Sequence, residues 1–107
     1  MTTRFIYVTA ANSEQAKTIG EALVAERLAA CANILAPMTS IYRWQGKVQH
    51  DTEAVLIAKT RADLVERVIA RVRELHSYTV PCVVSLVIEQ GNPAFLQWIT
   101  DETAGAA

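Results

Sequence analysis

Residues 31–60 read "CANILAPMTSIYRWQGKVQHDTEAVLIAKT", and this stretch decides the fold of the chain. Two runs rich in β-branched and aromatic residues flank the segment Gln45-Gly46-Lys47, which is typical of a β-hairpin with a short glycine-containing turn. We therefore predict antiparallel strands over residues 31–44 and 47–60. Pro37 lacks a backbone N–H, so it should lie at a sheet edge or at a bulge in the first of these strands.

The residues before the hairpin predict an amphipathic helix. Asn12 or Ser13 can cap its first turn, and Gln15 stands three residues after Asn12, as in a capping box. Apolar residues then recur at helical spacing, and the helix should end near Leu28. These apolar residues are Ala16, Ile19, Leu23 and Val24.

The residues after the hairpin predict a second amphipathic helix, with Thr60 and Asp63 as another capping box. Its apolar positions are Leu64, Val65, Val68, Ile69, Val72 and Leu75. Two further strands complete the pattern, one over residues 4–10 and a continuous apolar one, expected to be buried, over residues 81–91. Asn92-Pro93 should cap a short last helix.

This order of elements predicts an α+β fold of the ferredoxin-like, split βαβ type. Right-handed crossovers give the sheet order 4-1-3-2, with all neighbouring strands antiparallel. Thr9 at the end of the first strand should then lie beside Cys82 at the start of the fourth, with His76 close by at the end of the second helix. A site within one chain is expected at this corner. Cys31 and Cys82 belong to opposite sheet edges, so we expect no disulfide between them.

Length and composition limit the class of protein. The 107 residues suffice for one domain, residues 1–107, and are too few for two. Ten basic residues stand against eleven acidic ones, so no basic surface of the kind that binds nucleic acid is expected. No apolar run approaches the ~20 residues that span a bilayer, and the N-terminal apolar stretch is too short for a signal peptide. We therefore expect a cytoplasmic protein without membrane contact.

The hairpin is longer than one small sheet needs, and this favours self-association. Tyr42 and Trp44 lie two residues apart near its tip, so they share a face. Aromatic side chains that project beyond their own core usually cover another surface, and a long exposed edge strand is a liability in a monomer. A homo-oligomer resolves both problems; the alternative is that Tyr42 and Trp44 fold onto their own sheet.

A second group of candidates combines Tyr42 and Trp44 with Glu53, Lys59 and Tyr78. Glu53 and Lys59 stand six residues apart on one strand, so their side chains share a face. A carboxylate and an ammonium on a mostly apolar strand need partners if they are buried. One interpretation is an ion pair or network that holds subunits together. The other is a polar cleft at a subunit boundary that binds an anion or a small effector.

Five segments resemble the CutA family, the divalent-cation tolerance proteins, in order and spacing. They are "LAACANI" (28–34), "SIYRWQGK" (40–47), "EAVLIAKT" (53–60), "HSYTVP" (76–81) and "GNPAFLQW" (91–98). The resemblance covers nearly the whole chain and implies a ferredoxin-like homotrimer in which long hairpins bridge neighbouring subunits. It also implies a role in tolerance of copper or another divalent cation. Mammalian relatives are linked instead to membrane anchoring of acetylcholinesterase, and the trimer resembles the PII signalling proteins, which bind small effectors between subunits.

The resemblance also implies candidate metal ligands. His76 matches the histidine of the family's "HPY" motif, with Ser77 in place of the proline. Some members have a cysteine near the end of the first strand and two successive histidines at the end of the second helix, where this chain has Thr9 and Leu75. Threonine and leucine are poor or absent ligands for a soft metal. Cys82 could supply the thiolate, and the alternatives are a helix-end histidine and a core cysteine.

The sequence contains no phosphate-binding glycine loop and no pattern of a nucleophile beside its base. We therefore expect a protein that is not an enzyme and acts in the divalent-cation response. The alternative is a PII-like sensor that binds a small effector in the cleft between subunits. A small enzyme on the same fold is the least supported interpretation.

Overall fold

The computed structural model describes residues 2–106, which form one four-stranded sheet and three α-helices. In chain order the elements are β1 (Thr3–Ala10), α1 (Ser13–Ala25), β2 (Cys31–Trp44), β3 (Lys47–Arg61), a 3-10 turn η1 (Ala62–Leu64), α2 (Val65–Leu75), β4 (Val83–Val87) and α3 (Pro93–Glu102). The sheet order is β2-β3-β1-β4 with every pair antiparallel. This confirms the predicted α+β class and the 4-1-3-2 order.

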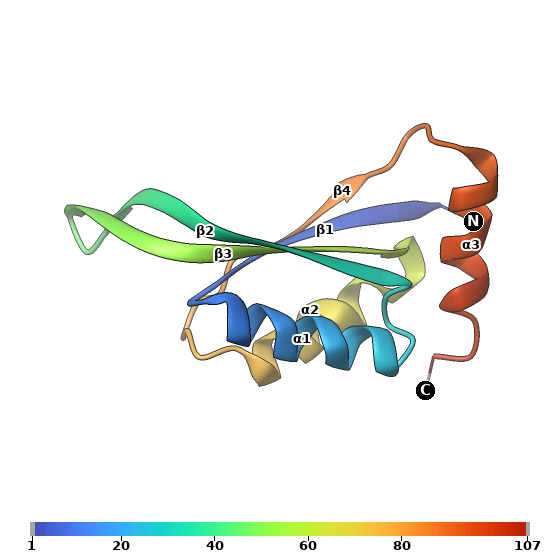
Figure 1. Cartoon of the computed structure of the whole chain (residues 1–107), viewed down its shortest axis with the longest axis horizontal. Helices are drawn as coiled ribbons and strands as arrows, with labels where there is room; N and C mark the ends of the chain where they lie inside the picture. Colours follow the sequence, from blue (N-terminus) through green and yellow to red (C-terminus); the bar gives the residue numbers. More distant parts are fainter. Residues whose placement is uncertain (1, 107) are drawn as a thin grey trace.

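The core lies between the sheet and two helices. Helices α1 and α2 cover one face of the sheet, and α3 stands at the end where β1 begins (Figure 1). Alternate residues of β1 and β3 point into this layer, as the two-residue period of a strand requires. The fully buried side chains here include Ile6, Val8, Leu56, Ile19, Leu23, Val68 and Val72. In the part of the chain described, no helix covers the opposite face of the sheet (Figure 1).

The hairpin of β2 and β3 is the longest feature of the fold and extends well beyond the helices (Figure 1). Gln45 and Gly46 turn it with φ of 50° and 78°, so glycine occupies a left-handed position that most residues avoid. The register shifts between Leu35 and Met38, on either side of Pro37. Pro37 therefore marks a bulge on an edge strand, as its missing N–H predicts.

Helix α1 starts as predicted and ends earlier than predicted. The Asn12 carboxamide accepts a 2.9 Å hydrogen bond from the Gln15 N–H, and the Gln15 side chain accepts one from the Ala11 N–H. The helix ends at Ala25 rather than near Leu28, because Arg27 adopts φ of 59°. Such a left-handed residue ends a helix. At the other end of the chain, Asn92 caps α3 by accepting from the Ala94 N–H, as expected.

The predicted capping box at Thr60 and Asp63 is wrong. Thr60 belongs to β3, where it pairs with Arg4 of β1. Its hydroxyl is buried and donates a 2.6 Å hydrogen bond to the carbonyl of Leu28. A 3-10 turn then leads into α2, which begins at Val65 with no side-chain cap. Thr60 thus satisfies a carbonyl beyond the end of α1 instead of an N–H at the start of α2.

Strand β4 is shorter and more exposed than predicted. It spans only Val83–Val87, and Val84, Leu86 and Val87 are all about half exposed or more. Val84 and Leu86 are exposed because they lie on the face of this edge strand that no element among residues 2–106 covers. The expectation of a buried strand followed from its apolar composition, which does not reveal what covers it.

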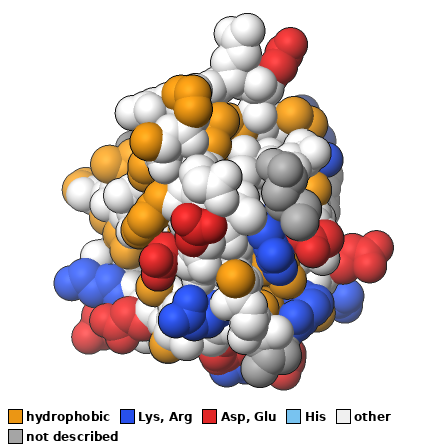
Figure 2. All heavy atoms as spheres, turned by 90° about the vertical axis from the view of Figure 1, so that its right-hand side faces the viewer, with side chains coloured by type: hydrophobic (Ala, Val, Ile, Leu, Met, Phe, Trp, Pro, Cys, Tyr) orange, Lys and Arg blue, Asp and Glu red, His pale blue; other side chains and the backbone are white. Residues whose placement is uncertain are grey.

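No helix in the described chain is long and apolar enough to cross a membrane. On the face of the molecule that carries α3, basic and acidic side chains are interspersed (Figure 2). Among the residues that the structure describes, no patch of a single sign of charge is visible on that face.

Candidate functional site

The predicted corner of Thr9, His76 and Cys82 exists. The Thr9 N–H donates to the carbonyl of Cys82 over 3.3 Å, which closes the end of the β1–β4 pairing. His76 ends α2 and places its Nε2 2.7 Å from the carbonyl oxygen of Thr9. Its Nδ1 accepts a 3.1 Å hydrogen bond from the N–H of Tyr78. The imidazole therefore links two backbone groups, the Thr9 carbonyl and the Tyr78 N–H, at the end of α2.

These bonds indicate which tautomer of the His76 ring is present. Nδ1 accepts a hydrogen bond from the Tyr78 N–H, so Nδ1 carries no hydrogen. Nε2 therefore carries the hydrogen and donates it to the carbonyl of Thr9. Both ring nitrogens are then occupied by backbone groups, and neither is free for a metal ion. Within residues 2–106, no three or more His, Cys, Asp or Glu side chains form a group suited to a metal. The metal site at His76 and Cys82 stays a prediction, and this geometry favours the helix-end role of His76.

A groove of about 660 Å³ lies between the hairpin and the segment that follows α2. Its size falls within the ~300–1,000 Å³ of small-molecule sites. The lining residues come from β1, β2, β3 and residues 78–82. They are Tyr7, Thr9, Met38, Thr39, Ser40, Ile41, Tyr42, Trp44, Glu53, Tyr78, Val80 and Cys82. Four of the five predicted cleft residues, all except Lys59, therefore line one groove.

Glu53 and Tyr78 form the polar centre of the groove. Glu53 is only 9% exposed, and its Oε2 accepts a 2.7 Å hydrogen bond from the Tyr78 hydroxyl. Burial, together with this bond to a carboxylate, raises the pKa of Tyr78 to about 12. Tyr78 is therefore a neutral donor throughout the physiological range.

A second tyrosine–carboxylate pair lies beside the first. The Tyr42 hydroxyl donates to Oδ2 of Asp51, and this hydrogen bond raises the pKa of Tyr42. Asp51 was not singled out from the sequence. The available signal was its place two residues before Glu53 on one strand, which puts both carboxylates on the same face.

Lys59 lies apart from this group. Its Nζ donates a 2.6 Å hydrogen bond to the side-chain oxygen of Asn33, near the start of β2. Six residues along a strand separate Glu53 from Lys59 by about 20 Å, so sharing a face does not bring them together. The two side chains form no ion pair with each other within the chain.

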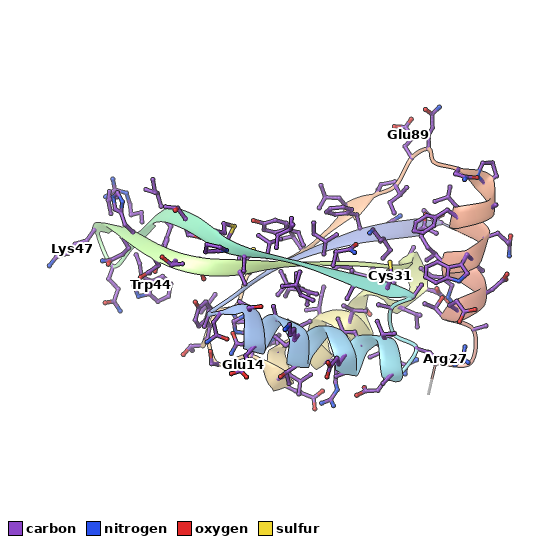
Figure 3. The ribbon with its side chains drawn as sticks, in the orientation of Figure 1. Glu14, Arg27, Cys31, Trp44, Lys47 and Glu89 are labelled. Carbon is purple, nitrogen blue, oxygen red and sulfur yellow. The ribbon has the colours of Figure 1, made fainter. Side chains whose placement is uncertain are left out.

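The aromatic residues of the hairpin do not fold onto their own core. Tyr42 and Trp44 are 41% and 50% exposed. Trp44 lies near the hairpin tip, close to the turn that precedes Lys47 (Figure 3). Both rings line the groove and remain open to solvent on their outer side.

Cys31 and Cys82 are both free thiols, on the two edge strands or next to them. Cys82 is exposed and lines the groove, whereas Cys31 is partly buried on β2. The expected absence of a disulfide between them agrees with the opposite edges they occupy.

Fold and site together define a class of protein: a ferredoxin-like α+β domain with an extended hairpin and an aromatic groove at its base. The family described as CutA1 divalent ion tolerance protein matches residues 4–102, and the chain belongs to this family.

Individual relatives agree with this assignment. Protein CutA homolog of Xenopus laevis is 48% identical over 95 residues, which are 89% of this chain and 63% of that protein. The divalent-cation tolerance protein CutA of Thermus thermophilus is 47% identical over 98 residues, 92% of this chain and 95% of that one. The crystal structure of CutA1 from Oryza sativa superposes with a TM-score of 0.94 at 39% identity, over 98% of this chain and 96% of that one.

Proposed function

We propose that the protein acts as a cytoplasmic homotrimer in the response to divalent cations and that it does not catalyse a reaction. The observation that carries the proposed assembly is the uncovered face of the sheet, and the family match supports the role in the response to divalent cations. Leu35, Val84 and Leu86 lie on it with exposed fractions of 60%, 49% and 50%. A large exposed apolar surface on a small domain marks a contact with another protein surface.

Strand register supports one continuous apolar face. Leu86 pairs with Phe5 across the sheet, and Val84 pairs with Tyr7. Tyr7 pairs on its other side with Ile57, so the same row of side chains continues into β3. The row lies on the side of the sheet away from α1 and α2. A second copy of the chain that covered this face would also pack against the projecting hairpin.

Native mass spectrometry of the reduced protein tests the assembly. We expect a trimer mass at micromolar concentration, and a monomer would contradict the proposal. Titration with copper and zinc in the same experiment tests direct metal binding. Three metals per trimer that disappear in His76→Ala would establish a metal site at the corner, despite the backbone partners of His76. No retained metal would assign the cation response to another site or mechanism.

The groove favours a second candidate function, the binding of a small effector, as in PII-like sensors. Its volume, its aromatic walls and its buried carboxylate are typical of a small-molecule site. Tyr7 belongs both to the apolar row and to the wall of the groove, so in the trimer proposed here the groove would lie at the boundary between subunits, beside the hairpin. Effector binding would then change the packing of the hairpin and could be detected as a change in trimer stability.

A further inference from the structure

Among the described residues, Glu53 is a buried carboxylate without a cationic partner. Within this part of the chain its carboxylate accepts a hydrogen bond from Tyr78, which is neutral. The ion pairs among the described residues are Arg61–Asp63, Arg71–Glu26 and Arg71–Glu74, and none includes Glu53. Burying an unpaired carboxylate is unfavourable, because the protein interior solvates the charge less well than water does. A cation that entered the groove would supply the missing partner.

The walls of the groove suit the same kind of ligand. Four aromatic rings line it, from Tyr7, Tyr42, Trp44 and Tyr78. An aromatic face carries negative electrostatic potential and attracts ammonium and guanidinium groups, with tryptophan and tyrosine the most effective. No lysine, arginine or histidine is among the lining residues. The charge of the groove is therefore negative, with Asp51 adding a second carboxylate through Tyr42.

We propose that this groove binds a small organic cation, an ammonium or guanidinium compound, with Glu53 as its counter-charge and the rings of Tyr78 and Tyr42 beside the cationic group. This inference rests on the effector-binding function proposed above and assigns the chemical class of the effector. The volume of about 660 Å³ admits a drug-sized or smaller molecule.

A basic side chain of a second copy is the competing occupant. The hairpin carries Arg43 and Lys47 near its tip, and both are exposed. Either residue of a neighbouring subunit could reach Glu53 in an oligomer. A ligand titration distinguishes a free cation from a neighbour's side chain, because the occupancy of the groove rises with added ligand only if the occupant is a free cation.

Isothermal titration calorimetry with a series of ligands that share a butyl chain tests the proposal. The cationic probes are butylammonium, butylguanidinium and butyltrimethylammonium; butanol is the uncharged probe and pentanoate the anionic one. EDTA in the buffer removes competing metal ions. We expect the best cation to bind at least about tenfold more tightly than butanol, and pentanoate to bind most weakly. The order among the three cations identifies the preferred head group.

Two variants and a matched control localise the binding. Glu53→Gln keeps the shape and removes the charge, and it should weaken cation binding about tenfold or more. Tyr42→Leu removes an aromatic ring at a position that is 41% exposed and lies outside the core, and it should weaken binding several-fold. Glu66→Gln removes an exposed carboxylate on α2 and should leave binding unchanged.

The outcomes separate this inference from the function on which it rests. Equal binding of butanol and the cations would overturn the cationic class and retain a small-molecule groove. No binding of any probe by a protein that native mass spectrometry shows to be a trimer would overturn the inference alone. If Glu53→Gln also lowered the trimer mass, the counter-charge would belong to a neighbouring subunit. A wild-type monomer would instead overturn the proposed assembly.

Discussion

The Tyr78 hydroxyl donates a hydrogen bond to Oε2 of Glu53 over 2.7 Å and thereby ties the segment after α2 to β3. The backbone N–H of the same residue donates to Nδ1 of His76 over 3.1 Å. The rings of His76 and Tyr78 are also in contact, with centroids 4.6 Å apart. Tyr78 therefore connects the backbone corner at Thr9 with the groove, and a change at Tyr78 should affect both.

Tyr78→Phe should destabilise the fold by about 1–2 kcal/mol, because it leaves the Glu53 carboxylate without its donor. The variant retains the ring contact with His76, so the loss of stability measures the contribution of the Tyr78 hydroxyl. Chemical denaturation at fixed protein concentration measures the effect. In a double-mutant cycle with Glu53→Gln, the two losses should be less than additive. Full additivity would show that the pair does not interact.

Tyr78 should ionise at a higher pH than a tyrosine in the unfolded chain. Its pKa is raised from 10.0 to about 12, so between these pH values the folded chain retains a proton that the unfolded chain has lost. The stabilising contribution is therefore complete below the unfolded value and declines as the pH rises through the folded one. An ultraviolet titration of tyrosinate should show a step near pH 12 that disappears in Tyr78→Phe. A step near pH 12 that survives in this variant would contradict the assignment.

Local patterns predicted much of the fold because their physics acts within a few residues. The turn at Gln45 and Gly46, the cap at Asn12 and the bulge at Pro37 each depend on one backbone requirement. The handedness of crossovers then determined the sheet order and placed Thr9 beside Cys82.

Side-chain hydrogen bonds between distant segments were not predicted, because no local signal indicates which side chains will meet. Thr60 followed three residues later by Asp63 resembles a capping box, and only the pairing of Thr60 with Arg4 shows that its hydroxyl faces inward. Glu53 was identified as a polar residue in need of a partner. Its partner is Tyr78, 25 residues away in sequence, and not Lys59 on the same strand.

Thr60→Val should cost about 1–3 kcal/mol, since valine preserves the volume and removes the hydroxyl that donates to the carbonyl of Leu28. Thr52→Val, on the exposed part of β3, is the matched control and should change stability by less than about 0.5 kcal/mol. The free energy of unfolding from urea titration measures both. Equal effects at the two positions would mean that the Thr60 hydroxyl does not stabilise the end of the α1 connection.

Leu86→Lys tests whether the open sheet face is a contact between copies. Leu86 is 50% exposed on the edge strand β4, so a charge there does not disturb the core of a single chain. In a trimer that buries this face, the lysine would lose its hydration without gaining a partner, and the subunits should dissociate. We expect the mass measured by light scattering to fall toward that of one chain, while the far-ultraviolet circular dichroism stays native. Ala70→Lys, at an exposed position on α2 on the other side of the sheet, should leave the mass unchanged. If Leu86→Lys stayed a trimer, the surface that joins the copies would lie elsewhere, and the hairpin aromatics Tyr42 and Trp44 would be the next positions to replace.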